Sequence, residues 1–152
     1  MANFNADIAA NLAATPPVRD KTRQINGRVR WFEATFTALA ANPQIADTIT
    51  WGTLPNNCRP IGHLALLSWS AGTVACTLNL GDAASVARHL AATGVNVAGS
   101  AVPNATQANG GQFDTTDISS AATNNCTLIS TVAGAVVAVG QVITLRFPYV
   151  AD

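Results

Sequence analysis

Apolar and polar side chains alternate with a period of two from residue 29 onward. In "VRWFEATFTA", residues 29–38, Phe32, Ala34 and Phe36 fall on one face and Glu33 and Thr35 on the other. The same alternation recurs in "TVACTLNL", residues 73–80, and in "VITLRFPYV", residues 142–150. A strict period of two predicts strands that place one face on a core and the other outside it.

Three further segments, 45–51, 61–69 and 126–132, are strand candidates, and 61–69 is apolar on both faces, which indicates a central strand. Turn-forming residues separate the strands at 41–43, 54–60 and 70–72. A segment rich in Gly, Asn, Ala and Ser, residues 94–111, predicts one long loop. Many short strands with few helices predict an all-β fold, an antiparallel β-sandwich or jelly roll.

Residues 1–28 do not share this pattern. Residues 5–14 are compatible with one short helix. Pro16 and Pro17 would end that helix and force the chain there into an extended path. We therefore expect two parts: an extended N-terminal arm over residues 1–28 that orders against a partner, and a β-sandwich body over residues 29–152.

One stretch of the body, "CTLNLGDAASVARHLAAT" at residues 76–93, predicts a strand, a turn and then a short helix over residues 85–92. Asp82 fits the N-cap of that helix, Gly81 would supply an unusual backbone dihedral, and Arg88 would lie near the helix C-terminus. A phosphate-binding loop would need a second glycine and a lysine, which are absent. We interpret Gly81, Asp82 and Arg88 as a structural corner.

Charge is scarce and unevenly placed. Of the 152 residues, 49% are hydrophobic and only 11% are charged, with a formal net charge of zero, which suits a chain that packs against other subunits. The segment at residues 19–30 is basic, with Asp20 as its one acid. We expect it to anchor the chain on an acidic protein surface; nucleic-acid binding beside Trp31, or a solvated tail, are the alternatives. The basic residues are Arg19, Lys21, Arg23, Arg28 and Arg30.

No motif in the chain indicates catalysis, a metal or a cofactor. The cysteines, Cys58, Cys76 and Cys126, lack metal-site spacing and predict a reducing compartment. His63 is expected in the core or at an interface, and His89 half-exposed. A small hydrolase built on His63, His89 and Asp82 remains an alternative, because catalytic groups are assembled in space. We predict neither a membrane span nor a signal peptide.

The order of three segments resembles a known family. "LPNNCRPIGHLALL", then "VACTLNLGDAASVARHLAAT", then "TLISTVAGAVVAVGQVITLRFPYV" is similar to the succession in jelly-roll head decoration, or cement, proteins of tailed bacteriophages. The resemblance covers about residues 29–150 and leaves out the arm and the 94–111 loop. The positions that carry it are Leu54, Pro55, Ile61, Leu66, Leu78, Leu80, Gly81, Asp82, Arg88, Gly140, Val142 and Tyr149.

The resemblance implies a non-enzymatic virion protein without a cofactor. Such a protein is made in the bacterial cytoplasm, binds the outer surface of the head, bridges subunits of the major capsid protein and stabilises the shell. It also implies self-association as a symmetric homo-oligomer, with neither membrane nor direct nucleic-acid contact. Two alternatives are a tail or fibre component of the virion and a carbohydrate-binding jelly roll that uses Trp51 or Trp69.

Overall fold

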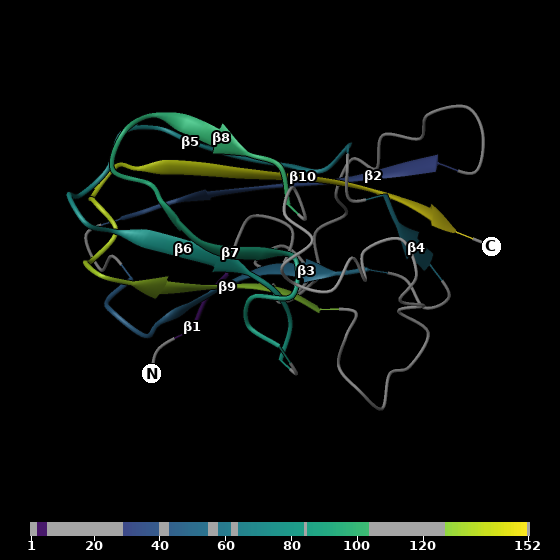
Figure 1. Ribbon diagram of the computed structural model, residues 1–152, viewed down its shortest axis with the longest axis horizontal. Coiled ribbons are helices and arrows are strands. Elements are labelled where there is room, and N and C mark those ends of the chain that lie inside the picture. The colour runs from purple at the N-terminus through teal and green to yellow at the C-terminus, as the bar shows by residue number, and fades with distance from the viewer. Residues whose placement is uncertain are drawn as a thin grey trace, which may run out of the picture.

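The computed structural model is a sandwich of two β-sheets (Figure 1). It describes residues 3–5, 29–39, 43–54, 58–61, 64–83, 85–103 and 127–151, and for residues 3–5, 58–60, 150 and 151 it describes the backbone alone. No α-helix occurs among these residues, so none in the described part of the chain could cross a membrane. The prediction of an all-β sandwich or jelly roll is confirmed.

The first sheet has the strand order β1-β3-β9-β6-β7, and the second has the order β2-β10-β5-β8, with β4 paired to β10. Neighbouring strands are antiparallel except for the parallel pair of β1 and β3. The strands are β1 (Asn3–Asn5), β2 (Val29–Thr37), β3 (Thr48–Thr53), β4 (Cys58–Pro60), β5 (Leu66–Trp69), β6 (Thr77–Leu80), β7 (Leu90–Gly94), β8 (Gly99–Ala101), β9 (Thr127–Ala133) and β10 (Val142–Ala151).

The longest strands follow the predicted alternation. Phe32, Ala34 and Phe36 of β2 are buried, and Ile143 and Leu145 of β10 are fully buried opposite them in the same sheet. The middle of the outer face is polar, with Thr35 opposite Thr144 and an exposed ion pair between Arg146 and Glu33, with 3.3 Å between nitrogen and oxygen. The pattern is therefore a reliable guide wherever one strand face meets the core and the other meets solvent.

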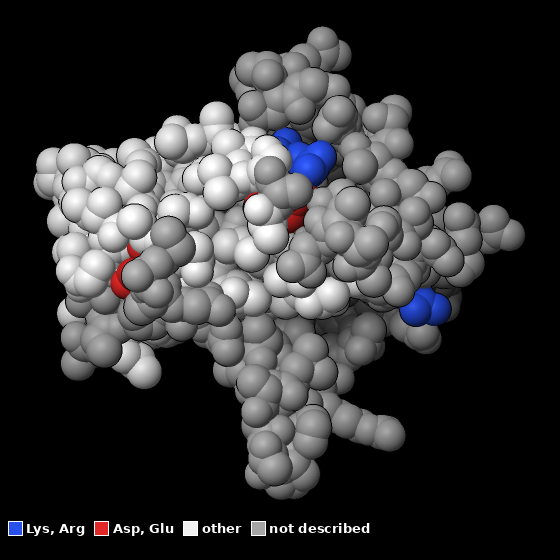
Figure 2. Space-filling view, turned by 90° about the horizontal axis from the view of Figure 1, so that it is seen from below, with Lys and Arg blue, Asp and Glu red and all other residues white. Residues whose placement is uncertain are grey.

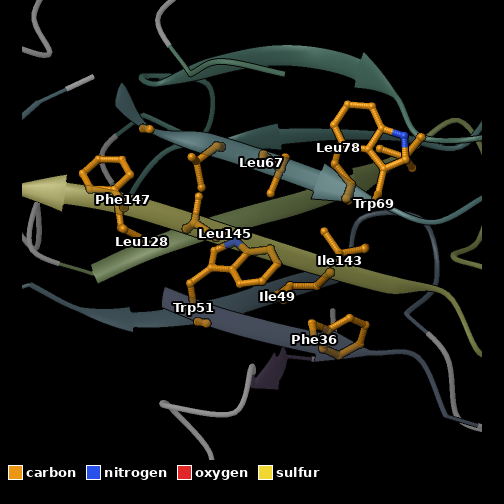
Figure 3. Packing of buried hydrophobic residues seen from close by; sticks show 14 of the residues in the cluster. Phe36, Ile49, Trp51, Leu67, Trp69, Leu78, Leu128, Ile143, Leu145 and Phe147 are labelled. Carbon is orange, nitrogen blue, oxygen red and sulfur yellow. The ribbon is translucent and has the colours of Figure 1, made fainter. Parts of the chain in front are cut away.

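The core fills the space between the two sheets. Figure 3 shows side chains from both layers pointing toward one another, with Trp51 of β3 close to the middle. The indole Nε1 of Trp51 donates a hydrogen bond of 2.8 Å to Oγ of Ser130 in β9, so this buried polar group is satisfied. The largest fully buried apolar side chains are Trp51, Phe147, Ile49, Leu54, Leu67, Leu78, Leu80, Leu128, Ile143 and Leu145.

The prediction of a helix over residues 85–92 is wrong. Residues 85–89 form turns, and Leu90–Gly94 is strand β7, which pairs with β6 through Leu80 and Leu90. The alanine-rich sequence favours a helix locally, but pairing with β6 satisfies the backbone and extends the sheet. Tertiary context decides the structure here.

The predicted loop at 94–111 and the strand at 73–80 also need correction. Gly94 ends β7, and Gly99–Ala101 forms β8 at the edge of the second sheet, so the first part of the predicted loop belongs to the sheets. Residues 104–111 lie outside the described residues. The strand at 73–80 begins only at Thr77, and Val74 is 77% exposed instead of sharing the core face with Leu78.

Of the predicted arm, the structure describes only β1, which runs parallel to the edge of β3. Asn3 pairs with Thr48 and Asn5 with Thr50. Asn5, the first residue of the possible helix at 5–14, belongs to β1, and the rest of that segment and the two prolines lie outside the described residues. The division of the chain at residue 28 stays a prediction.

Candidate functional site

The corner between β6 and β7 contains Gly81, Asp82 and Arg88, which the sequence predicts to be structural and not a phosphate-binding loop. Gly81 exchanges two backbone hydrogen bonds of 2.9 Å with Ile129 of β9. A Cβ at position 81 would lie 2.1 Å from the carbonyl oxygen of Ser85. The expected positive backbone dihedral is not found, since the described glycines with positive φ are Gly52, Gly134 and Gly140. Glycine is needed at position 81 because the next turn approaches it closely.

Asp82 is buried in this corner, with its side chain fully inaccessible to solvent. Its Oδ1 accepts a hydrogen bond of 2.8 Å from the backbone N–H of Ser85, the bond expected of an N-cap, but a turn follows instead of a helix. Its Oδ2 accepts from Nε of Arg88 at 2.5 Å, and the Arg88 side chain is 17% exposed. The carboxylate thus joins both sides of the turn through a charged, largely desolvated pair.

His89 is 4% exposed, so the expectation of a half-exposed ring, which rested on the helix, is wrong. The ring contacts Phe147 of β10 edge-on, with 5.6 Å between ring centroids. Burial lowers the pKa of His89 from 6.5 to about 4, while Asp82 acts to raise it and Arg88 to lower it. At neutral pH the ring is therefore an uncharged part of the packing.

The residues named for alternative chemistries do not gather at a described surface. Trp51 is fully buried and Trp69 is 9% exposed, which contradicts the hypothesis that either one stacks on a sugar. The side chains of His63, Cys58 and Cys126 lie outside the described ones. Cys76 is buried, which raises its thiol pKa, and no group of three potential metal ligands occurs among the described residues.

The basic segment is described only at its end, Arg30 in β2. Arg30 pairs with Tyr149 and lies two residues before Phe32, so it shares the core-facing side of β2, where it is partly exposed. The other four basic residues, Arg19, Lys21, Arg23 and Arg28, lie outside the described residues. Their role in anchoring the chain stays a prediction.

The sheets bring four connections together at the opposite end of the sandwich, a feature that sequence reasoning did not anticipate. We call it the four-loop end, formed by the described residues 38–39, 43–47, 70–76, 95–98 and 134–141. It is the left end of the molecule in Figure 1. The strand register places these connections at the same end. Val142 at the start of β10 pairs with Thr37 at the end of β2. Likewise, Gly99 at the start of β8 pairs with Trp69 at the end of β5.

Hydrogen bonds tie these loops to one another. The N–H of Gly72 donates to the carbonyl of Asn96 at 3.0 Å, and that of Val137 donates to Pro43 at 3.1 Å. Buried Gln141 joins the 134–141 loop to the 70–76 and 95–98 loops through Nε2, which donates to the carbonyls of Ser70 at 3.0 Å and Val95 at 2.8 Å. The loops therefore form one connected surface.

The backbone of this end is also unusually constrained. Ala46 and Ala75 have φ values of 72° and 67°, in the left-handed region that alanine rarely adopts. Gly134, with φ of 75°, passes so close to the carbonyl of Ala75 that a Cβ would lie 2.0 Å from its oxygen. The fold holds the loops in strained conformations that the local sequence does not favour.

Comparison with known proteins finds the same fold in two phage capsid structures. A chain in the capsid of Ralstonia phage GP4 is 24% identical, with a TM-score of 0.69 over 99% of this chain and 99% of that chain. A chain in the capsid asymmetric unit of cyanophage Pam1 is 22% identical, with a TM-score of 0.58 over 89% of this chain and 93% of that one. No protein-family model and no curated protein matches the chain.

Proposed function

We propose that this chain is a structural protein of a bacteriophage virion, more specifically a decoration or cement protein. In this role it binds the outer surface of the head, bridges neighbouring major capsid subunits and stabilises the shell. The observation that carries the proposal is the fold shared over 99% of both chains with a component of the Ralstonia phage GP4 capsid. The role is non-enzymatic and needs no cofactor.

The composition supports a role in assembly. Only 11% of the residues are charged and the formal net charge is zero, so long-range repulsion between copies is weak. Many copies that each bury a modest area raise the stability of a shell by mass action, because they bind the assembled state. A protein of this kind needs a rigid body with fixed contact surfaces, and the tied loops of the four-loop end provide one.

The basic segment is the part of the chain that we propose to contact the shell. Arg19, Lys21, Arg23, Arg28 and Arg30 concentrate five of the eight Lys and Arg residues in twelve positions, 19–30. Such a cluster accelerates and orients binding to an acidic surface. Asn3–Asn5 pair with β3 of the body, so for these residues the expectation of ordering against a partner is wrong. We propose that the rest of the arm, residues 6–28, orders when it binds the shell.

The location of the protein in the particle separates this proposal from a tail or fibre component. Purified virions are separated into heads and tails, and the copies of this chain are counted in each fraction by quantitative mass spectrometry against the major capsid protein. We expect it in the head fraction at a copy number comparable to that of the shell subunits. A few copies confined to tails would refute decoration and favour the alternative.

A further inference from the structure

The four-loop end carries the most prominent uncharged apolar surface among the described residues. Each of its four loops contributes at least one aliphatic side chain that is more than half exposed. Isolated exposed aliphatic residues are ordinary, but a cluster at one end of a molecule marks a contact surface. The side chains are Leu39 at 72%, Ile45 at 57%, Val74 at 77%, Val97 at 70% and Val139 at 66% exposed.

This end has almost no ionisable group. Within the described residues 38–39, 43–47, 70–76, 95–98 and 134–141, Asp47 is the one residue among Asp, Glu, Lys, Arg and His. It is 6% exposed, and its Oδ2 accepts a hydrogen bond of 2.9 Å from the backbone N–H of Gln44. On the face seen in Figure 2, the described part of this end, at the left, is white apart from one small red area, and the blue groups lie away from it.

The lack of charge on this surface restricts which partner surfaces can bind it. With almost no exposed charge, it gives an acidic or basic partner little to pair with, and a charged partner surface would be desolvated without compensation. Its partner must therefore be apolar and uncharged as well. A second copy of the same end meets this requirement, and two copies with a net charge of zero do not repel each other.

The surface is also prepared for binding. Hydrogen bonds hold the loops together in the single chain, from Gly72 to Asn96 and from Gln141 to Ser70 and Val95. A preordered surface loses less conformational entropy on association than mobile loops would. Apolar contact thus gives a larger net gain here than the same side chains would on flexible loops.

We propose that the four-loop end is the surface through which copies of this chain bind one another, in a closed symmetric oligomer. This deepens the proposed function and rests on it: the resemblance to decoration proteins implies self-association but does not locate the surface. The basic segment enters β2 at Arg30, at the other end of the sandwich, so shell attachment and self-association use different parts of the molecule.

The test measures the oligomeric state of the purified full chain by sedimentation velocity and light scattering over a range of concentrations. The variant Val74→Asp with Val97→Asp places two charges on the four-loop end. Val86→Asp is the matched control, since Val86 is 54% exposed in the turn before β7, at the opposite end. Circular dichroism and thermal unfolding check that each variant is folded.

We expect the wild type and the control to self-associate, and the double variant to dissociate at least about 30-fold more readily, as for loss of a central contact residue. A wild type that is monomeric at every concentration, or a folded double variant that associates like the wild type, would overturn the proposal. If the double variant loses binding to heads while the wild type is monomeric, the apolar surface binds the shell and self-association through it is wrong.

Binding to heads is measured separately, so the two proposals can fail independently. Self-association without binding to heads contradicts the cement function and leaves the surface assignment intact. Head binding by a monomeric wild type contradicts the surface assignment and leaves the cement function intact.

Discussion

At the scale of a single residue, His89 makes the free energy of unfolding depend on pH. Its pKa is 6.5 in the unfolded chain and about 4 in the fold, lowered mainly by burial. Because the unfolded chain binds the proton more tightly, the residue has no effect well above pH 6.5, and stability is lost progressively as the pH falls from 6.5 through 4.

We expect the loss to reach about 3 kcal/mol of unfolding free energy below pH 4, from the difference between the two pKa values. Denaturant unfolding of the wild type and of His89→Leu between pH 7 and pH 4 isolates this contribution. As the pH falls, the unfolding free energy of His89→Leu should rise relative to that of the wild type. Parallel pH profiles would show that His89 is not buried as described.

Asp82 provides a second test at the residue scale. Asp82→Asn removes the charge that pairs with Arg88 inside the corner, and breaking a buried pair from one side costs about 3 kcal/mol. Glu33→Gln is the control, because Glu33 and Arg146 form an ion pair whose side chains are 48% and 53% exposed, and such pairs contribute little.

Equilibrium unfolding in urea at neutral pH measures both changes. We expect Asp82→Asn to lower the midpoint clearly and Glu33→Gln to leave it almost unchanged. Similar small effects for both would mean that the Asp82 pair is solvated in the folded protein and does not hold the corner.

At the scale of elements, the corner between β6 and β7 depends on the absence of a side chain at position 81. In Gly81→Ala, the new Cβ would lie 2.1 Å from the Ser85 carbonyl oxygen, so the backbone must shift, and we expect a loss of about 2 kcal/mol or more. Gly94→Ala is the control, since its Cβ would meet only the Asn96 side chain at 3.4 Å. Equal stability of the two variants would contradict the close approach.

The elements that the sequence predicts well are those whose two faces differ. β2 and β10 alternate between core and solvent along most of their length, so Phe32 and Leu145 could be placed inward from the pattern alone. The segment at 85–94 could not be predicted in this way. Asp82 caps Ser85 as at a helix start, and the alanines around Leu90 favour a helix, but pairing of Leu90 with Leu80 across the sheet overrides both.

The four-loop end shows a different limit of prediction. Its exposed side chains come from loops far apart along the chain, such as those of Leu39 and Val139, and only strand register brings them together. Each loop alone looks like an ordinary connection. The scarcity of ionisable residues in these loops is visible in the sequence, because Asp47 is their one such residue. Nothing in the sequence, however, shows that the loops share one end of the fold.

At the scale of the whole molecule, the proposal assigns shell attachment to the basic segment. Replacing Arg19, Lys21, Arg23 and Arg28 by glutamine should weaken binding to heads by about tenfold or more and reduce its dependence on salt, because charge complementarity is lost. This substitution leaves β1 in place, which deletion of residues 1–28 would not. Co-sedimentation with heads at several salt concentrations provides the measurement.

Arg146→Gln is the control for this experiment, because it removes one exposed positive charge from the outer face of the body. We expect it to bind heads like the wild type. Unchanged binding by the glutamine variant of the basic segment would exclude the segment as the anchor. The attachment surface would then have to lie on the body.

Stabilisation of the head is the central claim, and adding purified protein to heads that lack it tests this most directly. The measurement is the temperature at which packaged DNA becomes accessible to a dye, with and without the protein bound. The account predicts saturable binding on the head surface and release of DNA at a higher temperature than in bare heads. Heads that bind none of the protein, or that release DNA at the same temperature when saturated with it, would contradict the account.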